Sequence, residues 1–193
     1  MSSLDINVNN VFNVSRSFQS HSLLNEALAA FEKAMILKPD FNFKLQMAQI
    51  YGEQGDVEKM FVSYMDFVQN NEVAINNIKR AINDFISEDA TNENNILLKK
   101  ILLIKMQQEP NILWNNMLSW LFIQQRDFDK AFIQEKAIFS RAPGSVQGFF
   151  NLALAALDQN RLDVAYEIFE HVLEVAPKTD DRLEATRQIL LIE

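Results

Sequence analysis

The chain has 193 residues, of which 48% are hydrophobic and 23% are charged, and it contains only four glycines and four prolines. These values exclude a disordered chain and leave few turn residues for hairpins, so they predict an all-α fold. The absence of cysteine excludes disulfides, thiolate metal sites and cysteine nucleophiles, and a formal net charge of −8 argues against a duplex nucleic-acid ligand.

Residues 1–7 are predicted to form an N-terminal tail, and they carry neither the basic nor the apolar segment of an export signal. No apolar run approaches the roughly 18 residues that a membrane helix needs. As written, the sequence therefore predicts a soluble protein without a membrane span. The compartment stays open: the cytoplasm fits the sequence as written, and the periplasm fits if a leader was removed.

The four prolines follow apolar-periodic segments at regular intervals. Pro39, Pro110, Pro143 and Pro177 lie 71, 33 and 34 residues apart, and 71 is two units of 34 plus three. Proline cannot continue a helix and biases its predecessor away from the α conformation, so each proline is expected to close a helix. We therefore predict five units at 8–40, 41–74, 75–111, 112–145 and 146–178. The third unit is irregular, because the loop SEDATNEN accommodates the three extra residues.

Within these units an alanine is often followed four residues later by an aromatic residue, as in Ala27 and Phe31 or Ala165 and Phe169. Two antiparallel helices approach closely only where one of them presents a small side chain. The alanines at 27, 48, 131, 153 and 165 are therefore predicted helix contacts. The aromatic side chains of Phe31, Tyr64 and Phe169 would fill the space beside them.

A 34-residue period with an alanine, an aromatic residue four positions later and a closing proline resembles the tetratricopeptide repeat (TPR), a helix-turn-helix unit, as in TPR scaffold proteins of bacterial type. The resemblance covers nearly the whole chain and is clearest in 146–178. It implies a right-handed α-solenoid of antiparallel helix pairs with about eleven helices. It also implies a protein-protein interaction scaffold that binds a peptide or helix of a partner protein.

In this family the first helix of each unit lines a concave groove, and the matching positions give the predicted partner-binding residues. In the first three units they are polar and suited to hydrogen-bonding an extended backbone: Asn13, Arg16, Gln46, Gln49 and Arg80, together with Asn9 and Glu53. In the last two units they are Asn116, Met117, Trp120, Phe150, Asn151 and Leu154. Met117, Trp120, Phe150 and Leu154 would form an apolar cluster for an amphipathic helix or hydrophobic peptide. The alternative is that this apolar stretch packs against neighbouring helices.

One subfamily of these repeats holds a C-terminal carboxylate between lysines, asparagines and an arginine. Asn13 and Arg80 stand at matching positions in this chain. Asn9 and Asn76, however, stand where lysines are expected, and Gln46 replaces an asparagine. The substitutions argue against that type of carboxylate site.

His171 shares one predicted helix face with Glu167 and Glu174, which is a conceivable metal or acid-base cluster. Carboxylate metal sites in helical proteins draw matched motifs from several helices, and no second motif is visible. We therefore favour a solvated helix face with local charge pairs. No other constellation suggests catalysis, so the sequence predicts a protein that is not an enzyme and uses no metal or cofactor.

Residues 179–193 are predicted to form a capping helix. Asp180 or Asp181 would cap its N-terminus, and Leu183, Ile189 and Leu190 would face the fifth unit. The outer face of a solenoid cap is usually polar, whereas this segment ends in ILLIE. That ending favours an alternative function, namely self-association as a homodimer through this helix or a place within a longer repeat array.

Overall fold

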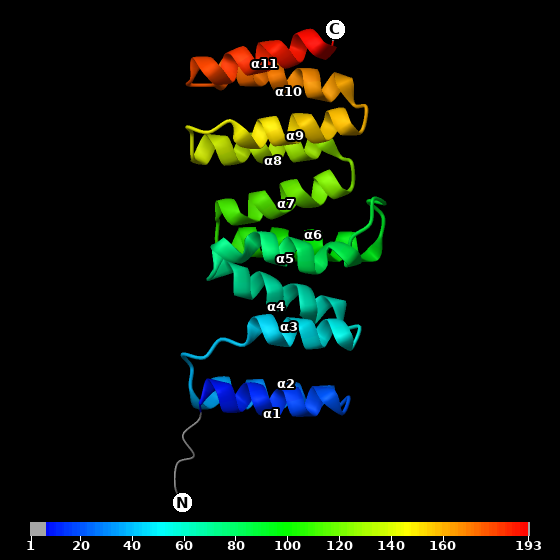
Figure 1. Cartoon of the computed structure of the whole chain (residues 1–193), viewed down its shortest axis with the longest axis vertical. Helices are drawn as coiled ribbons and strands as arrows, with labels where there is room; N and C mark the ends of the chain where they lie inside the picture. The colour runs from blue at the N-terminus through cyan, green and yellow to red at the C-terminus, as the bar shows by residue number, and fades with distance from the viewer. Residues whose placement is uncertain (1–6, 193) are drawn as a thin grey trace, which may run out of the picture. The chain divides into compact units, whose positions relative to one another are not determined.

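The computed structural model describes residues 7–192, and every regular element in this range is a helix (Figure 1). In chain order these are α1 (Val8–Ser20), α2 (Leu24–Leu37), α3 (Lys44–Glu53), α4 (Val57–Gln69), α5 (Ile75–Ile82), α6 (Glu93–Gln108), α7 (Ile112–Gln124), α8 (Phe128–Arg141), α9 (Gln147–Asp158), α10 (Leu162–Val175) and α11 (Thr179–Ile192), with 3-10 segments at Glu72–Ala74 and Asn83–Phe85. The predicted all-α fold is confirmed. Residues 1–6 of the predicted tail, and residue 193, lie outside the described range.

The chain divides into two compact bodies, an N-terminal body (Met1–Ile82) and a C-terminal body (Asn83–Glu193). In the N-terminal body the main pairs are α1 with α2 and α3 with α4. In the C-terminal body each helix from α6 to α11 packs against the next one along the chain. Short turns join the members of a pair, so the paired helices run antiparallel. The division between the bodies falls inside the segment 75–111, which the sequence marks as irregular.

Small side chains stand where paired helices approach one another. The Ser15 hydroxyl on α1 is buried and donates to the carbonyl oxygen of Ala27 on α2 at 3.3 Å. The five alanines predicted as helix contacts are all completely buried: Ala27, Ala48, Ala131, Ala153 and Ala165. The three predicted space-filling aromatic residues are at most 4% exposed. The prediction that these positions form the helix contacts is confirmed.

Four of the turns between paired helices share one backbone geometry. Ser22, Gly55, Arg126 and Asn160 have φ between +56° and +76°. In each turn the N–H of the following residue donates at 2.9 Å to the carbonyl oxygen five positions earlier. This bond and the left-handed residue define a Schellman helix end. The four residues are spaced 33, 71 and 34 apart, a series with the same members as the proline spacings.

The loop that precedes α6 is organised by Asn95, whose side chain is fully buried. Its Nδ2 donates to the carbonyl oxygens of Ser87 at 2.7 Å and Asp89 at 2.8 Å, and its Oδ1 accepts from the Ser87 N–H at 3.2 Å. Asp89 in turn accepts from the Thr91 N–H at 2.8 Å. One amide side chain thus satisfies three backbone groups of an irregular segment, which the sequence analysis did not foresee.

The capping helix α11 differs from its prediction in two respects. It begins at Thr179, so Asp180 and Asp181 lie within its first turn, and the prediction that one of them is the N-cap is wrong. Leu183 and Leu190 are 63% and 66% exposed, so the prediction that they face the fifth unit is wrong. The buried residue of α11 is Ala185, a small side chain that lets α11 approach α10 closely and turns the two leucines outward.

Candidate partner-binding groove

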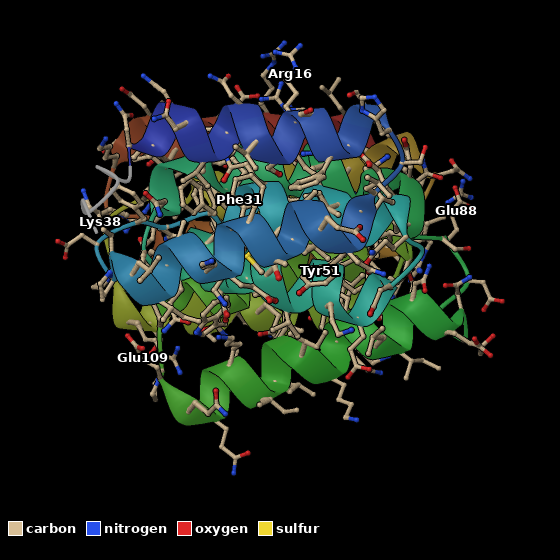
Figure 2. All side chains as sticks on the ribbon, turned by 90° about the horizontal axis from the view of Figure 1, so that it is seen from below. Arg16, Phe31, Lys38, Tyr51, Glu88 and Glu109 are labelled. Carbon is tan, nitrogen blue, oxygen red and sulfur yellow. The ribbon has the colours of Figure 1, made fainter. Side chains whose placement is uncertain are left out.

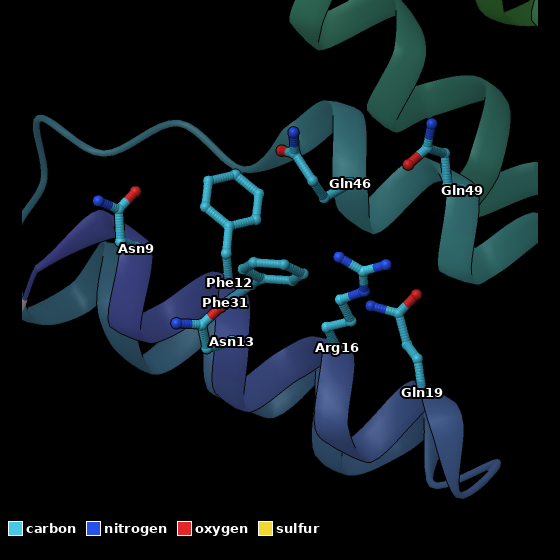
Figure 3. Close-up of a pocket in the computed structure, with 8 residues that line it drawn as sticks. All are labelled: Asn9, Phe12, Asn13, Arg16, Gln19, Phe31, Gln46 and Gln49. Atoms are coloured by element: carbon cyan, nitrogen blue, oxygen red, sulfur yellow. The ribbon is translucent and has the colours of Figure 1, made fainter.

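An open groove of about 800 Å³ lies between α1 and α3 in the N-terminal body (Figure 3). Its lining residues are Asn9, Phe12, Asn13, Arg16 and Gln19 from α1, Phe31 from α2, and Gln46 and Gln49 from α3. Four predicted binding residues, Asn13, Arg16, Gln46 and Gln49, are therefore brought together around one cavity. Asn9 joins them, whereas Glu53 does not line the groove.

The base of the groove is aromatic. The Phe12 ring lies edge-on to Phe31 at 5.8 Å and to Phe43 at 5.4 Å between ring centroids. Phe31 and Phe43 are at most 2% exposed and belong to the core of the N-terminal body, where Figure 2 shows Phe31 between α1 and α2. Phe12 is only partly buried and packs against this core, so its ring forms an apolar part of the groove surface. Phe12 was not among the predicted binding residues, although it lies one turn before Arg16 on the same helix face.

Arg16 is the only charged side chain among the eight lining residues. It extends from α1 toward α3 (Figure 3). It is exposed, and within residues 7–192 it forms no ion pair or side-chain hydrogen bond. A guanidinium with free donors in an acid-free groove is suited to a carboxylate, which it can bind through two parallel hydrogen bonds.

The remaining polar side chains of the groove are amides. Gln46 Oε1 is buried and has no hydrogen-bond partner among the described residues. A buried acceptor without a donor costs about 1–3 kcal/mol, so this atom provides a site for a donor supplied from outside. The side-chain amides of Asn9, Asn13 and Gln49 are also unpartnered within residues 7–192. The groove therefore offers both donors and acceptors along its length.

Arg80, the fifth polar residue predicted for this surface, does not line the groove. Its Nε donates to the Asn76 carbonyl oxygen at 3.3 Å, and its Nη2 donates to Asn77 Oδ1 at 2.5 Å. Both partners belong to α5, the helix of Arg80 itself. Arg80 is therefore engaged locally, and the structure does not place it beside Asn13.

The predicted apolar cluster lies on α7 and α9 of the C-terminal body. Met117 is completely buried, so the prediction that it contacts a partner is wrong. α7 is apolar around most of its circumference, and the sequence alone could not tell which side faces inward.

The other predicted residues on α7 and α9 differ in exposure: Trp120, Asn116 and Phe150 are partly buried, while Asn151 and Leu154 are exposed. Phe150 packs near Phe169 at 5.8 Å between ring centroids, and none of these residues lines the groove between α1 and α3.

His171 is packed between helices. Its ring lies edge-on to Phe132 at 5.4 Å and to Phe149 at 5.1 Å, and its Nδ1 is 3.6 Å from the Glu174 carboxylate. Within residues 7–192 no three His, Cys, Asp or Glu side chains are grouped so that they could hold a metal ion. In the same range no helix is long and apolar enough to cross a membrane.

Comparison with known families identifies one repeat in the C-terminal body. Residues 146–179, which contain α9 and α10, match the family model of the tetratricopeptide repeat. This segment is similar to a single TPR. The matched TPR contains Ala165 and Phe169 at the helix contact and the left-handed residue Asn160 in its turn. A TPR fold suggests a scaffold for protein-protein interaction.

Two solved structures are similar to this chain. One is a tetratricopeptide repeat protein from Parabacteroides merdae, with 14% identity and a TM-score of 0.44, which covers 98% of this chain and 73% of the other. The second is a thermophilic TPR protein of Thermus thermophilus, with 17% identity and a TM-score of 0.43, covering 94% and 98% of the two chains. No curated protein matches the sequence.

Proposed function

We propose that the protein is a noncatalytic scaffold whose groove between α1 and α3 binds an extended, acidic peptide segment of a partner protein. The observation that carries this proposal is the guanidinium of Arg16, which has no partner within residues 7–192 and lies in a groove that no Asp or Glu of that range lines. The chain as a whole has a net charge of −8, so a free cation within an acid-free cavity is a local exception. Such an exception favours an anionic ligand.

The amide lining favours an extended ligand over a helical one. A helix uses its backbone N–H groups internally, whereas an extended chain presents them to its surroundings. A backbone N–H of the peptide would donate to Gln46 Oε1, which has no partner among the described residues. Asn13 and Gln49 would bond the neighbouring carbonyl and N–H groups, a carboxylate would pair with Arg16, and one apolar side chain would rest on Phe12.

Selection from a displayed library of linear peptides on the full chain tests this function. We expect the selected peptides to carry Asp or Glu beside an apolar residue. Arg16→Gln should weaken their binding at least tenfold, about 1.4 kcal/mol. Lys33→Gln is the matched control, because Lys33 is an exposed cation on α2 that does not line the groove. Selected peptides whose binding does not depend on Arg16 would contradict the proposal.

A second candidate function is self-association through α11. Leu183, Leu190 and Leu191 on this helix are 63%, 66% and 70% exposed, which is unusual for three leucines on one helix. A homodimer would bury them, as would further repeats in a longer array. Sedimentation equilibrium over a wide concentration range should then show a dimer that Leu190→Glu dissociates. A wild-type chain that remains monomeric at every concentration would eliminate the homodimer.

A further inference from the structure

The helix α6 carries apolar side chains on two sides. Leu98, Ile101 and Leu102 are buried, with at most 7% exposure. Ile96, Leu103 and Ile104 are 48%, 50% and 43% exposed. Within the C-terminal body α6 packs mainly against α7, which accounts for the buried side. A helix with apolar residues around its circumference is normally covered on all sides, so the exposed side calls for an explanation.

α6 is the green helix in Figure 2, and its exposed side chains Ile96 and Leu103 form a narrow apolar seam along it. Ile96 and Leu103 are seven residues apart, so they lie along one helix face. Ile104 lies beside this line. We call the set Ile96, Lys99, Lys100, Leu103 and Ile104 the α6 stripe.

The α6 stripe is basic in an acidic chain. α6 contains three lysines and one glutamate, while the chain carries a net charge of −8. Lys99 and Lys100 lie on opposite flanks of the seam between Ile96 and Leu103. Neither lysine forms an ion pair within residues 7–192. The stripe therefore combines apolar area with two cations that have no partner in that range.

We propose that the α6 stripe docks an amphipathic helix of another protein whose apolar seam is flanked by Asp and Glu. Ile96 and Leu103 are separated by two helical turns, about 10 Å along the axis. Apolar anchors two turns apart on a partner helix would meet this pair, as in helix-on-groove recognition. Carboxylates on both flanks of that helix would pair with Lys99 and Lys100, which sets its orientation and excludes basic helices.

Charge argues against two other occupants. Two-fold pairing of α6 with the α6 of a second copy would bring four unpaired lysines to one seam, where like charges repel. An anionic bilayer would attract the stripe but repel a chain with a net charge of −8. The proposal is independent of the groove between α1 and α3, since no residue of the stripe lines that groove.

Selection on the full chain from a displayed library of helix-forming peptides, with apolar and charged positions varied independently, tests this inference. We expect the selected peptides to share an apolar seam with acidic flanks and to bind more weakly as salt increases. The double variant Ile96→Ser with Leu103→Ser should reduce affinity at least tenfold. Its matched control, Ile36→Ser with Leu37→Ser, removes two exposed apolar side chains from α2, which are 78% and 55% exposed, and should change affinity less than twofold.

Charge-reversal variants provide a second test that does not depend on the folding of the serine variant. Lys99→Glu with Lys100→Glu should abolish binding of the acidic helices, while Lys33→Glu with Lys178→Glu should leave it intact. Selected helices that bind the serine double variant as well as wild type would overturn the proposal. It would also be overturned if the selected helices were basic, if α6 mediated only dimerisation, or if the chain bound only phosphatidylserine vesicles through α6.

Discussion

Asn95 and Ser87 exchange two hydrogen bonds, with Asn95 Nδ2 donating to the Ser87 carbonyl oxygen at 2.7 Å and the Ser87 N–H donating to Asn95 Oδ1 at 3.2 Å. This reciprocal pair of hydrogen bonds resembles the pair that two residues exchange between adjacent β-strands, although this segment has no regular secondary structure. Asn95 is fully buried, so these bonds compensate the cost of removing its amide from water.

Asn95→Ala should lower the free energy of unfolding by about 2–4 kcal/mol, because it removes three hydrogen bonds that a fully buried side chain makes to the backbone of Ser87 and Asp89. Urea denaturation followed by circular dichroism measures this change. Asn94→Ala is the control, since Asn94 makes a single bond from Nδ2 to the Phe85 carbonyl oxygen at 3.1 Å. Equal effects of the two substitutions would show that Asn95 does not organise the loop.

The shared turn geometry predicts opposite effects for two substitutions. Gly55 has φ of +76°, and no atom lies within 4 Å of the position that a Cβ would take, so Gly55→Ala adds backbone strain without a clash and should cost about 1–2 kcal/mol. Ser22 has φ of 59° in the equivalent turn, and Ser22→Gly should relieve strain there and leave stability equal or slightly higher. Thermal unfolding compares the two variants. A destabilising Ser22→Gly would contradict the interpretation that these turns are equivalent.

Acid should weaken the start of α4. Asp56 accepts from the Lys59 side chain at 2.7 Å and from the Lys59 N–H at 3.1 Å, and these hydrogen bonds hold the pKa of the Asp56 carboxyl below its usual value. A carboxyl whose pKa is lower in the folded state than in the unfolded state stabilises the fold at pH values above the unfolded pKa, which is near 4. This stabilisation is lost as the pH falls through the pKa of the folded state. Wild type should thus lose stability below about pH 4 relative to Asp56→Asn, which keeps the capping oxygen but cannot ionise. A difference in unfolding free energy that stays constant with pH would refute this role.

Trp120 and Trp114 on α7 should respond differently to truncation. Trp114 is completely buried and donates from Nε1 to the Glu109 carbonyl oxygen at 3.0 Å, so Trp114→Ala should cost about 3–5 kcal/mol. Trp120 is only partly buried, so Trp120→Ala should cost clearly less. Urea denaturation of both variants provides the comparison. A loss at Trp120 as large as that at Trp114 would identify it as a core residue and remove it from the candidate surface.

The helix contacts could be predicted from sequence because the packing that causes them is local. Ala27 and Phe31 lie one turn apart on one helix, and only a small residue permits the approach of α1. The polar groove residues were predicted from the family resemblance, because Arg16 and Gln49 stand at positions that line the concave face in tetratricopeptide repeats. Their coming together around one cavity required the structure.

Other features depend on contacts that no periodic pattern encodes. Met117 lies on a helix that is apolar on most sides, and burial by its neighbours decides which side is inside. Leu183 points outward because Ala185 forms the contact with α10. Asn95 is one polar residue in an irregular loop, and its role follows from backbone groups whose positions only the fold defines.

The central claim is that a carboxylate of the bound peptide pairs with Arg16. A double-mutant cycle tests this pairing most directly. A peptide selected on the groove and its Asp→Asn counterpart would be titrated into wild type and Arg16→Gln, with affinities measured by fluorescence anisotropy. The account predicts that wild type prefers the Asp peptide at least fivefold, about 1 kcal/mol, and that this preference disappears in Arg16→Gln. The same preference in both proteins, or none in wild type, would contradict it.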